Sequence, residues 1–441
     1  MLKAAARNSP ESNGQIPAIF SFFDEVFNNA SLPPFAIRLW EGSTWNYGNQ
    51  DPKFTLELKH PGALDALFRR PTELTLGEAY IYDDFDIQGD LEACFYFGDH
   101  LIGQSRSMSE KLRLAGQIFR LRAVRRRGPA ENQAARLRGR PHSRQRDAEA
   151  VRYHYDVSND FYRLWLDQRM VYSCAFFHSP QDSLDEAQLR KLDYICRKLR
   201  LKPGERLLDI GCGWGGMIIH AAQNYGVNAL GITLSEPQAQ LANARIREAG
   251  LEDRCRVEVC DYRDLDESEP FDKLVSIGMF EHVGEQNLPT YFEKAYNLLK
   301  PGGVFLNHGI TLSMMNPPTK GPTFIDKYVF PDGDLLPVST SLRIAEQSRF
   351  EIRDVECLRE HYALTLRNWV ERLEANRDAA ISLTSPVTYR IWRIYMSGSA
   401  HGFKTGRISL HQTLLARSES KEGPVPLTRC DWYRPCPNGH H

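Results

Sequence analysis

The sequence predicts an α/β protein: a doubly wound, mainly parallel sheet with a small α+β N-terminal domain. Two observations predict this class. From Glu205 onward, short apolar runs alternate with amphipathic segments, which is the pattern of repeated βα units. Before residue 105 the runs are shorter and follow no such order, as in a small mixed domain. A chain of 441 residues is long enough for two separate cores.

Residues 1–105 are expected to form the small domain. Its strand-like runs are at 35–42, 43–48 and 53–60, and its helix-like runs are at 62–70 and 75–85. We find no catalytic arrangement of side chains in this part of the sequence. The domain is therefore interpreted as a module that docks on lipid or membrane.

A basic linker is expected at residues 106–147. Between positions 106 and 146, thirteen arginines and lysines stand against two acidic residues, Glu110 and Glu131. Such a block attracts an anionic bilayer at roughly 1 kcal/mol per residue. The alternative is a solvated linker that its charge keeps extended, and composition does not choose between the two. Nucleic acid is not expected as a partner, since the sequence has no base-stacking motif.

Residues 148–418 are predicted to form the main domain, beginning with helices at 148–166 and 185–200. Strands are expected at 206–211, 228–233, 256–261, 273–279, 303–310, 350–358 and 408–417. Helices are expected at 216–226, 235–250 and 288–300, the last two closed by glycine or Pro-Gly. Residues 311–340 and 359–405 interrupt the alternation and are candidates to cover a site at the strand ends.

The tail, residues 419–441, is polar and is expected to be disordered. Its Cys430, Cys436, His440 and His441 could hold a metal, but a plain tail is the simpler interpretation and no metal site is predicted. Nine scattered cysteines without a CxxC pair indicate reduced thiols. The sequence has neither a run of about twenty apolar residues nor a secretory signal, so a cytoplasmic protein is expected.

The most informative motif is ERLLDIGCGWGG at residues 205–216. An apolar strand ends at Asp209 and breaks into a glycine turn before a helix. Gly211 and Gly213 let the backbone turn sharply and approach a ligand without a Cβ clash. The following helix N-terminus offers N–H groups to a carboxylate or a phosphate. In this context the motif predicts a site for a nucleotide or for S-adenosylmethionine.

The ends of the next two strands favour S-adenosylmethionine over a dinucleotide. A dinucleotide site needs GxGxxG and an acidic residue about twenty positions later. Here the spacing is GxGxGG, and Thr233 stands where the acid would be expected. The third strand ends in Cys260, Asp261 and Tyr262, where a carboxylate and a ring can meet an adenine.

Seven segments in order then carry a family resemblance: HYDVSNDFY (154–162), YSCAFF (172–177), DIGCGWGG (209–216), GITLSEPQ (231–238), GMFEHVG (278–284), NHGI (307–310) and IDKYVFPDG (325–333). This series resembles that of the cyclopropane fatty acid synthases and the related mycolic acid cyclopropane synthases and acyl-chain methyltransferases. The resemblance covers about residues 150–417 and implies a Rossmann-like methyltransferase. Residues 17–103 are similar to the N-terminal domain of the longer, phospholipid-modifying members.

The resemblance also implies the site residues. The residues implied to contact S-adenosylmethionine are Tyr172, Ser173, Gly211, Gly213, Thr233, Leu234, Gln238 and Asp261. Asp209 and Tyr262, at the strand ends, complete the candidate cofactor site. The resemblance further implies that bicarbonate serves as the base, held by Glu281, His308, Tyr328 and the backbone of Cys174 and Ile310. Methyl transfer to an isolated alkene leaves a carbocation, and ring closure then needs a base in a water-free pocket.

Each catalytic candidate also has a simpler interpretation. Glu281 could cap the following helix, His308 and Tyr328 could be ordinary buried residues, and Cys174 a small core residue. His282 is expected to face away from Glu281, as neighbours on a strand do.

Three further observations concern the surroundings of the site. His154 is a second candidate near the cofactor. Ser399 stands where relatives commonly have a cysteine, which supports direct transfer without a covalent enzyme intermediate. A group of aromatic residues fits either an acyl tunnel or a plain core: Phe161, Tyr162, Trp165, Phe176 and Phe177.

The sequence thus predicts an enzyme at the inner leaflet of an anionic membrane that converts cis-unsaturated phospholipid acyl chains to cyclopropane chains. Two alternatives stay open. The same fold can give methylene- or methyl-branched chains, and a non-catalytic lipid-binding protein can be built on it. A homodimer formed through the N-terminal domain also stays open.

Overall fold

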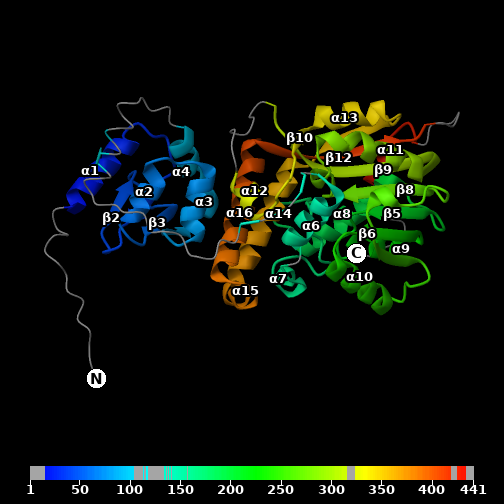
Figure 1. The fold of residues 1–441 in the computed structure, drawn as a ribbon, viewed down its shortest axis with the longest axis horizontal. Helices are drawn as coiled ribbons and strands as arrows, with labels where there is room; N and C mark the ends of the chain where they lie inside the picture. Colours follow the sequence, from blue (N-terminus) through cyan, green and yellow to red (C-terminus); the bar gives the residue numbers. More distant parts are fainter. Residues whose placement is uncertain are drawn as a thin grey trace, which may run out of the picture. The chain divides into compact units, whose positions relative to one another are not determined.

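The computed structural model describes residues 15–103, 113, 116–117, 134–135, 137, 139–140, 142–155, 157–314, 323–418 and 425–433. Most of the basic linker, and Cys436, His440 and His441, lie outside the described residues. The chain forms two compact units, which we describe separately (Figure 1). Unit 1 comprises residues 1–134, 322–324 and 386–398, and unit 2 comprises the remainder.

Unit 1 is built on a four-stranded sheet of order β2-β1-β3-β4, in which only β1 and β3 run parallel. Its core is aromatic, with the ring of Phe35 5.3 Å from the rings of both Phe27 and Phe54. The elements are α1 (Gln15–Phe27), β1 (Phe35–Arg38), β2 (Thr44–Tyr47), β3 (Phe54–Leu58), α2 (Gly62–Phe68), α3 (Glu73–Ile81), β4 (Phe85–Gly89) and α4 (Leu91–Gly103).

The prediction of one helix over residues 75–85 is wrong in its last four residues. Helix α3 ends at Ile81, and the chain turns at Asp83, whose φ of 64° is in the left-handed region. Phe85 then starts β4, which pairs antiparallel with β3. The aromatic, acid-rich sequence around the turn gave no clear sign of a strand start.

Unit 2 contains a sheet of order β11-β12-β9-β8-β5-β6-β7, to which β10 adds beside β9. The strands from β9 to β7 are parallel, and β12 runs antiparallel to both of its neighbours. This confirms the predicted, mainly parallel sheet. The strands are β5 (Arg206–Ile210), β6 (Asn228–Thr233), β7 (Cys255–Val259), β8 (Phe271–Ile277), β9 (Leu299–Leu312), β10 (Leu336–Pro337), β11 (Glu351–Cys357) and β12 (Ile408–Ala416).

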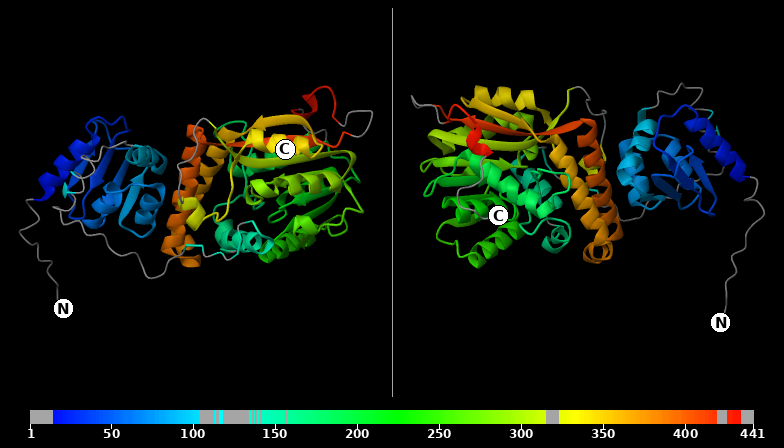
Figure 2. Two further views of the ribbon diagram at one scale, coloured as in Figure 1. Left: turned by 45° about the horizontal axis from the view of Figure 1, so that its top comes forward. Right: turned by 180° about the vertical axis from the view of Figure 1, so that it is seen from behind.

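Helices cover both faces of this sheet, as the two views of Figure 2 show. Alternate strand residues pack into two cores on opposite faces of the sheet. One core includes residues of α8, α9 and α10, and the other includes residues of α11 and α13. The helices of unit 2 are α6 (Arg144–Tyr155), α7 (Asn159–Arg163), α8 (Leu184–Leu199), α9 (Gly216–Tyr225), α10 (Glu236–Glu248), α11 (Leu288–Leu298), α13 (Val338–Gln347), α14 (Arg359–Ala375) and α15 (Arg377–Leu383); α12 (Phe324–Tyr328) and α16 (Pro386–Thr405) each include residues of both units.

Helix α8 matters most for the site. It begins at a capping box formed by Ser183 and Glu186, and it ends where Arg200 takes the left-handed conformation, with a φ of 52°. Lys191 and Lys198 are seven residues apart, about two turns, so they lie on the same face of the helix. Both are buried against the sheet side.

Two expectations about the ends of the main domain need correction. Helix α6 begins inside the predicted linker, and there Arg144 pairs with Asp264 at 2.6 Å. The described part of the tail is ordered: Trp432 is 2% exposed and Arg200 pairs with Asp431 at 2.8 Å. Apolar burial and ion pairing outweigh the polar composition of both segments.

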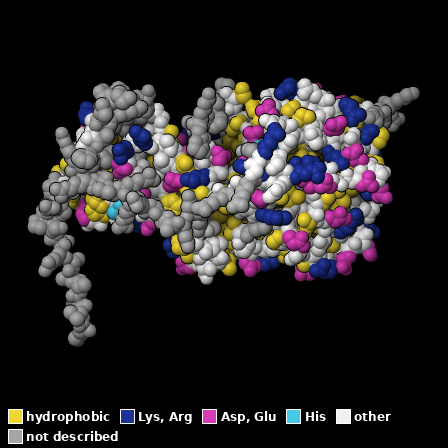
Figure 3. Space-filling view, in the orientation of Figure 1, with side chains coloured by type: hydrophobic (Ala, Val, Ile, Leu, Met, Phe, Trp, Pro, Cys, Tyr) yellow, Lys and Arg dark blue, Asp and Glu magenta, His cyan; other side chains and the backbone are white. Residues whose placement is uncertain are grey.

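The surface drawn in Figure 3 shows basic and acidic side chains interspersed over unit 2. That face of unit 2 therefore offers no uniformly basic patch among its described residues. In the described ranges, no helix is both long and apolar enough to cross a membrane. Every cysteine that the structure describes is a free thiol, and the described residues form no cluster suited to a metal ion.

Candidate active site

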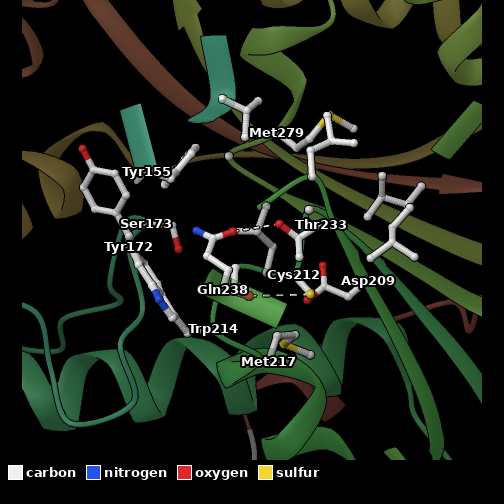
Figure 4. Close-up of a pocket in the computed structure, with 18 of the residues that line it drawn as sticks. Tyr155, Tyr172, Ser173, Asp209, Cys212, Trp214, Met217, Thr233, Gln238 and Met279 are labelled. Carbon is white, nitrogen blue, oxygen red and sulfur yellow. Dashed lines mark hydrogen bonds between the residues drawn. The ribbon is translucent and has the colours of Figure 1, made fainter. Parts of the chain in front are cut away.

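A cavity lies at the carboxyl ends of the parallel strands of unit 2 (Figure 4). It is where a doubly wound sheet places its ligands. The structure brings all ten of the predicted cofactor residues to its wall: Tyr172, Ser173, Asp209, Gly211, Gly213, Thr233, Leu234, Gln238, Asp261 and Tyr262.

The glycine turn after β5 is closely packed. Gly211 has a φ of 85°, and a Cβ there would lie 2.8 Å from the Cβ of Met279. The backbone N–H groups of Gly211 and Cys212 both donate to the carbonyl of Ile232, at 3.0 and 2.9 Å. A side chain at Gly211 would therefore displace the loop that borders the cavity.

The end of β6 presents two side chains that point toward each other in Figure 4. The hydroxyl of Thr233 donates to Oε1 of Gln238 at 2.8 Å. Ser235 caps α10 by accepting from the N–H of Gln238. This pair is buried, so its orientation is fixed before any ligand arrives.

The end of β7 holds a carboxylate in an ion pair that sequence reasoning missed. Arg263 donates to both oxygens of Asp261, at 2.8 and 2.6 Å, and reaches Asp147 of α6 at 3.1 Å. Burial opposes the ionisation of Asp261, but these hydrogen bonds outweigh it and lower the pKa of its carboxyl. Asp261, next to Tyr262 in the cavity wall, is therefore an ionised hydrogen-bond acceptor that Arg263 holds in place.

Lys191 is a second residue that sequence reasoning missed. Its ammonium donates to the hydroxyl of Ser173 at 3.0 Å, inside the cavity wall. Burial lowers the pKa of Lys191 to about 8 and raises the pKa of Asp209 to about 7, while each group favours the charge of the other. The helical spacing of Leu184, Lys191 and Ile195 was the signal that this lysine faces inward.

Glu281 lies in the 3-10 turn η3 (Phe280–His282), just after β8. Its Oε1 accepts from the backbone N–H of Ile310 at 2.7 Å. Its Oε2 is buried and has no hydrogen-bond partner among the described residues. Burial raises the pKa of this carboxyl to about 7. The helix-cap interpretation is wrong, because Glu281 binds the neighbouring strand β9 and not a helix end.

His308 lies on β9, two residues before Ile310 and on the same face of the strand. It is 1% exposed, and its Nδ1 is 3.1 Å from Nε2 of Gln412. Its Nε2 is buried and makes no hydrogen bond within the described part of the chain. Burial lowers the pKa of the imidazole well below its usual value, so the ring is neutral.

Tyr328 and Cys174 are also buried, but none of the five catalytic candidates is among the described residues that line the cavity. Tyr328 is 3% exposed, and its carbonyl accepts from the hydroxyl of Tyr153 at 3.2 Å. Cys174 is fully buried, and burial raises the pKa of its thiol. The described hydrogen bonds connect Glu281 to Ile310 and do not connect that pair to Tyr328 or Cys174.

His282 lines the cavity whereas Glu281 does not, in agreement with the expectation that the two side chains face different ways. The expected reason is wrong, because residues 280–282 form a 3-10 turn and not a strand. Burial lowers the pKa of His282 to about 4. His154 is also buried; its ring stacks on Phe330, with centroids 3.7 Å apart, and lies 5.6 Å from the ring of Tyr172.

The aromatic group beside YSCA packs as core. Tyr162 and Trp165 are fully buried with ring centroids 5.3 Å apart, and Phe176 stacks on Tyr194 at 4.5 Å. None of these residues is among the described residues that line the cavity. Ser399 is buried on α16.

Comparison with known proteins places this site in a family. Residues 142–413 match the family model described as mycolic acid cyclopropane synthetase. The chain belongs to this family. It is 40% identical to a probable fatty acid methyltransferase of Pseudomonas putida, over 91% of this chain and 96% of that one. Residues 22–97 match a second model, described only as a domain of unknown function.

Solved structures support the same assignment. The cyclopropane synthase MmaA2 from Mycobacterium tuberculosis has a TM-score of 0.59 and 36% identity, covering 61% of this chain and 98% of that one. The mycolic acid cyclopropane synthase CmaA1, in complex with S-adenosylhomocysteine and CTAB, has a TM-score of 0.58 at the same identity and coverage. The family member described here is thus an S-adenosylmethionine-dependent methyltransferase that acts on lipids.

Proposed function

We propose that this methyltransferase adds a methylene group from S-adenosylmethionine across the cis double bond of phospholipid acyl chains, which gives cyclopropane chains. The observation that carries the proposal is a pair of buried polar atoms that have no hydrogen-bond partner among the described residues: Oε2 of Glu281 and Nε2 of His308. Glu281 is bonded to β9 through Ile310, and His308 lies on that strand two residues earlier. Met279 and His282, on either side of Glu281 in the chain, line the cofactor cavity. A buried polar atom without a partner is costly, and a functional role is one of the explanations for it.

Bicarbonate fits these two residues. Glu281 can accept the hydroxyl of the anion, and His308 can donate to it when its proton is on Nε2. When bound, bicarbonate would supply a base for the proton that ring closure releases. Tyr328, and the backbone of Cys174 and Ile310, are the remaining proposed holders. The protein itself would exclude water from this region, and the burial of Glu281 and His308 supports this role.

The relatives support a substrate class. A cyclopropane mycolic acid synthase of Mycobacterium tuberculosis is 37% identical over only 59% of this chain. Unit 1 is shared with the probable fatty acid methyltransferases, one of which covers 93% of this chain. We therefore assign unit 1 and the basic linker to an anionic membrane surface, from which the acyl chain is taken.

A second candidate product is a methylene- or methyl-branched chain. Two relatives that cover more than nine-tenths of this chain are named probable fatty acid methyltransferases, not cyclopropane synthases. A sphingolipid C9-methyltransferase of Gibberella zeae is 34% identical over 63% of this chain. The same carbocation leads to either product, depending on which proton leaves or whether the cation is reduced.

The test is to incubate the full chain with S-adenosylmethionine and vesicles of cis-monounsaturated phospholipid, and to analyse the lipid by mass spectrometry and NMR. A gain of CH2 with high-field cyclopropane protons is expected. A gain of CH2 with vinylic protons, or of CH2 and two hydrogens, would favour the branched product. Parallel samples with free fatty acid, and with neutral and anionic vesicles, test the substrate and the surface. Absence of product with cofactor bound would contradict the proposal.

A further inference from the structure

Three polar side chains form a row across neighbouring strands beside the proposed anion site. Glu356 on β11 is paired in register with Gln412 on β12, and Gln412 is paired in register with His308 on β9. Residues in register on adjacent strands point to the same face of the sheet. This face is the one that α8 covers, because Lys198 of α8 contacts the row.

Lys198 holds the middle of the row. Its ammonium donates to Oε1 of Gln412 at 2.9 Å and forms an ion pair with Glu356. The lysine side chain is 1% exposed, and its ammonium lies 4.8 Å from the ring centre of Tyr194 and 5.2 Å from that of Trp432. The hydroxyl of Tyr194 in turn donates to Glu356 at 3.0 Å. A buried charge with such partners has one geometry, because moving it would leave the charge unpaired.

The direction of each hydrogen bond in the row follows from its ends. An ammonium group only donates, so the Gln412 oxygen must face Lys198 and the Gln412 amide nitrogen must face His308. That nitrogen also only donates, so Nδ1 of His308 must accept. A neutral imidazole that accepts at Nδ1 carries its proton on Nε2.

We propose that Gln412 is a positioning residue, locked by Lys198 and Glu356, which fixes His308 as the Nε2–H tautomer. His308 then presents a hydrogen-bond donor at its otherwise unpartnered Nε2 atom. The opposite tautomer would present a lone pair there and repel an anion. The role toward bicarbonate rests on the proposed function, whereas the tautomer is a property of the protein alone.

The direct test is NMR of the full chain labelled with 15N-histidine, without substrate or cofactor. His308 is identified by the signal missing from His308→Gln. A protonated Nε2 and an unprotonated Nδ1 are expected at neutral pH, with the Nε2 signal shifting when sodium bicarbonate is titrated in. A proton on Nδ1 would overturn the proposal whatever the activity of the enzyme.

The matched variant is Gln412→Met, which keeps side-chain volume and removes the amide. We expect a mixture of His308 tautomers, a weaker response to bicarbonate, and a fall in kcat of about 10- to 100-fold, the range found when a group that orients an active-site ligand is removed. The KM for S-adenosylmethionine should not change, since Gln412 does not line the cavity. An unchanged tautomer and unchanged kcat would overturn the proposal.

The control is Asn243→Leu. The Asn243 side chain, on α10, bonds the backbone N–H and C=O of Val257 on β7, and its replacement leaves the row intact. It should lower thermal stability without changing the His308 tautomer or kcat. If wild-type protein shows the Nε2–H tautomer yet makes no lipid product, the positioning role is supported and the proposed function fails. The two ideas can therefore fail independently.

Discussion

Two regions of unit 2 meet the same helix, α8, and each receives one buried lysine from it. Lys191 serves the cofactor cavity, where it donates to a neutral hydroxyl, Ser173, and lies near Asp209. Lys198 serves the strand face of His308, where Glu356 and Gln412 satisfy it. A buried charge is stable only when it is paired. The ammonium of Lys198 has an ion-pair partner, whereas Lys191 makes no ion pair in the described part of the chain.

This difference indicates that the two regions have different roles in cofactor binding and in the chemical step. The wall of the cofactor cavity includes Lys191, whose charge is favoured by Asp167 and Asp209 and which is a candidate partner for the carboxylate of S-adenosylmethionine. The His308 region is built to hold one proton at one atom. The first region should therefore control binding of the cofactor, and the second should control the chemical step.

The sharpest test of this division is Glu281→Gln. The variant keeps the shape of the side chain but removes the carboxylate that faces the proposed anion site. We expect turnover to fall by about 100-fold or more, because the anion proposed as the base loses the group that accepts its hydroxyl, with the affinity for S-adenosylmethionine unchanged. Steady-state kinetics and calorimetry measure the two quantities. Normal turnover would show that the carboxylate takes no part in the chemistry.

The reciprocal test is Lys191→Met. Loss of a hydrogen bond from a charged donor is worth about 1.5–3 kcal/mol, so the Kd for S-adenosylmethionine should rise roughly 10- to 100-fold by calorimetry. Turnover at saturating cofactor should change much less. Lys202→Met, an exposed lysine beyond the end of α8, is the control and should leave Kd unchanged. Equal losses in Kd and turnover would break the comparison.

The smallest expected effect is on stability against pH. Glu281 and Asp209 both have pKa values raised to about 7 by burial, so the folded state binds protons that the unfolded state releases. Their contribution to the free energy of unfolding therefore falls as pH rises from about 4 to about 7, whereas His282 and His308, whose pKa values are lowered by burial, contribute with the opposite sign.

Glu281→Gln removes one of these two contributions. At pH 8 it should be roughly 1–3 kcal/mol more stable than the wild type, and near pH 4 equally stable. Urea unfolding at several pH values measures this difference. Parallel curves for variant and wild type would contradict the raised pKa of Glu281.

The sequence predicted the cofactor region well because that region is local. The glycine turn, Thr233 and Asp261 each follow a strand directly, and carboxyl ends of parallel strands meet at one edge. Arg263 and Lys191 were missed because a charged residue in a turn or on an amphipathic helix normally faces solvent.

The His308 region could be predicted only in part. The motif NHGI marked His308, but Gln412 comes from the last strand, and its partner depends on how that strand pairs. Repeated βα units do not determine where an antiparallel strand enters the sheet. The backbone at His282 was also mispredicted, since the end of β8 was taken to continue as a strand where the chain forms a 3-10 turn.

The position of β12 has a consequence for the order in which the enzyme is made. It is the last of the described strands, yet it lies inside the sheet, between β9 and β11. During synthesis, a chain that has already formed its glycine turn and cavity still has an open edge at β9. His308 gains its neighbour only when residues 408–416 leave the ribosome, so a nascent chain would be able to bind its cofactor before it can carry out chemistry.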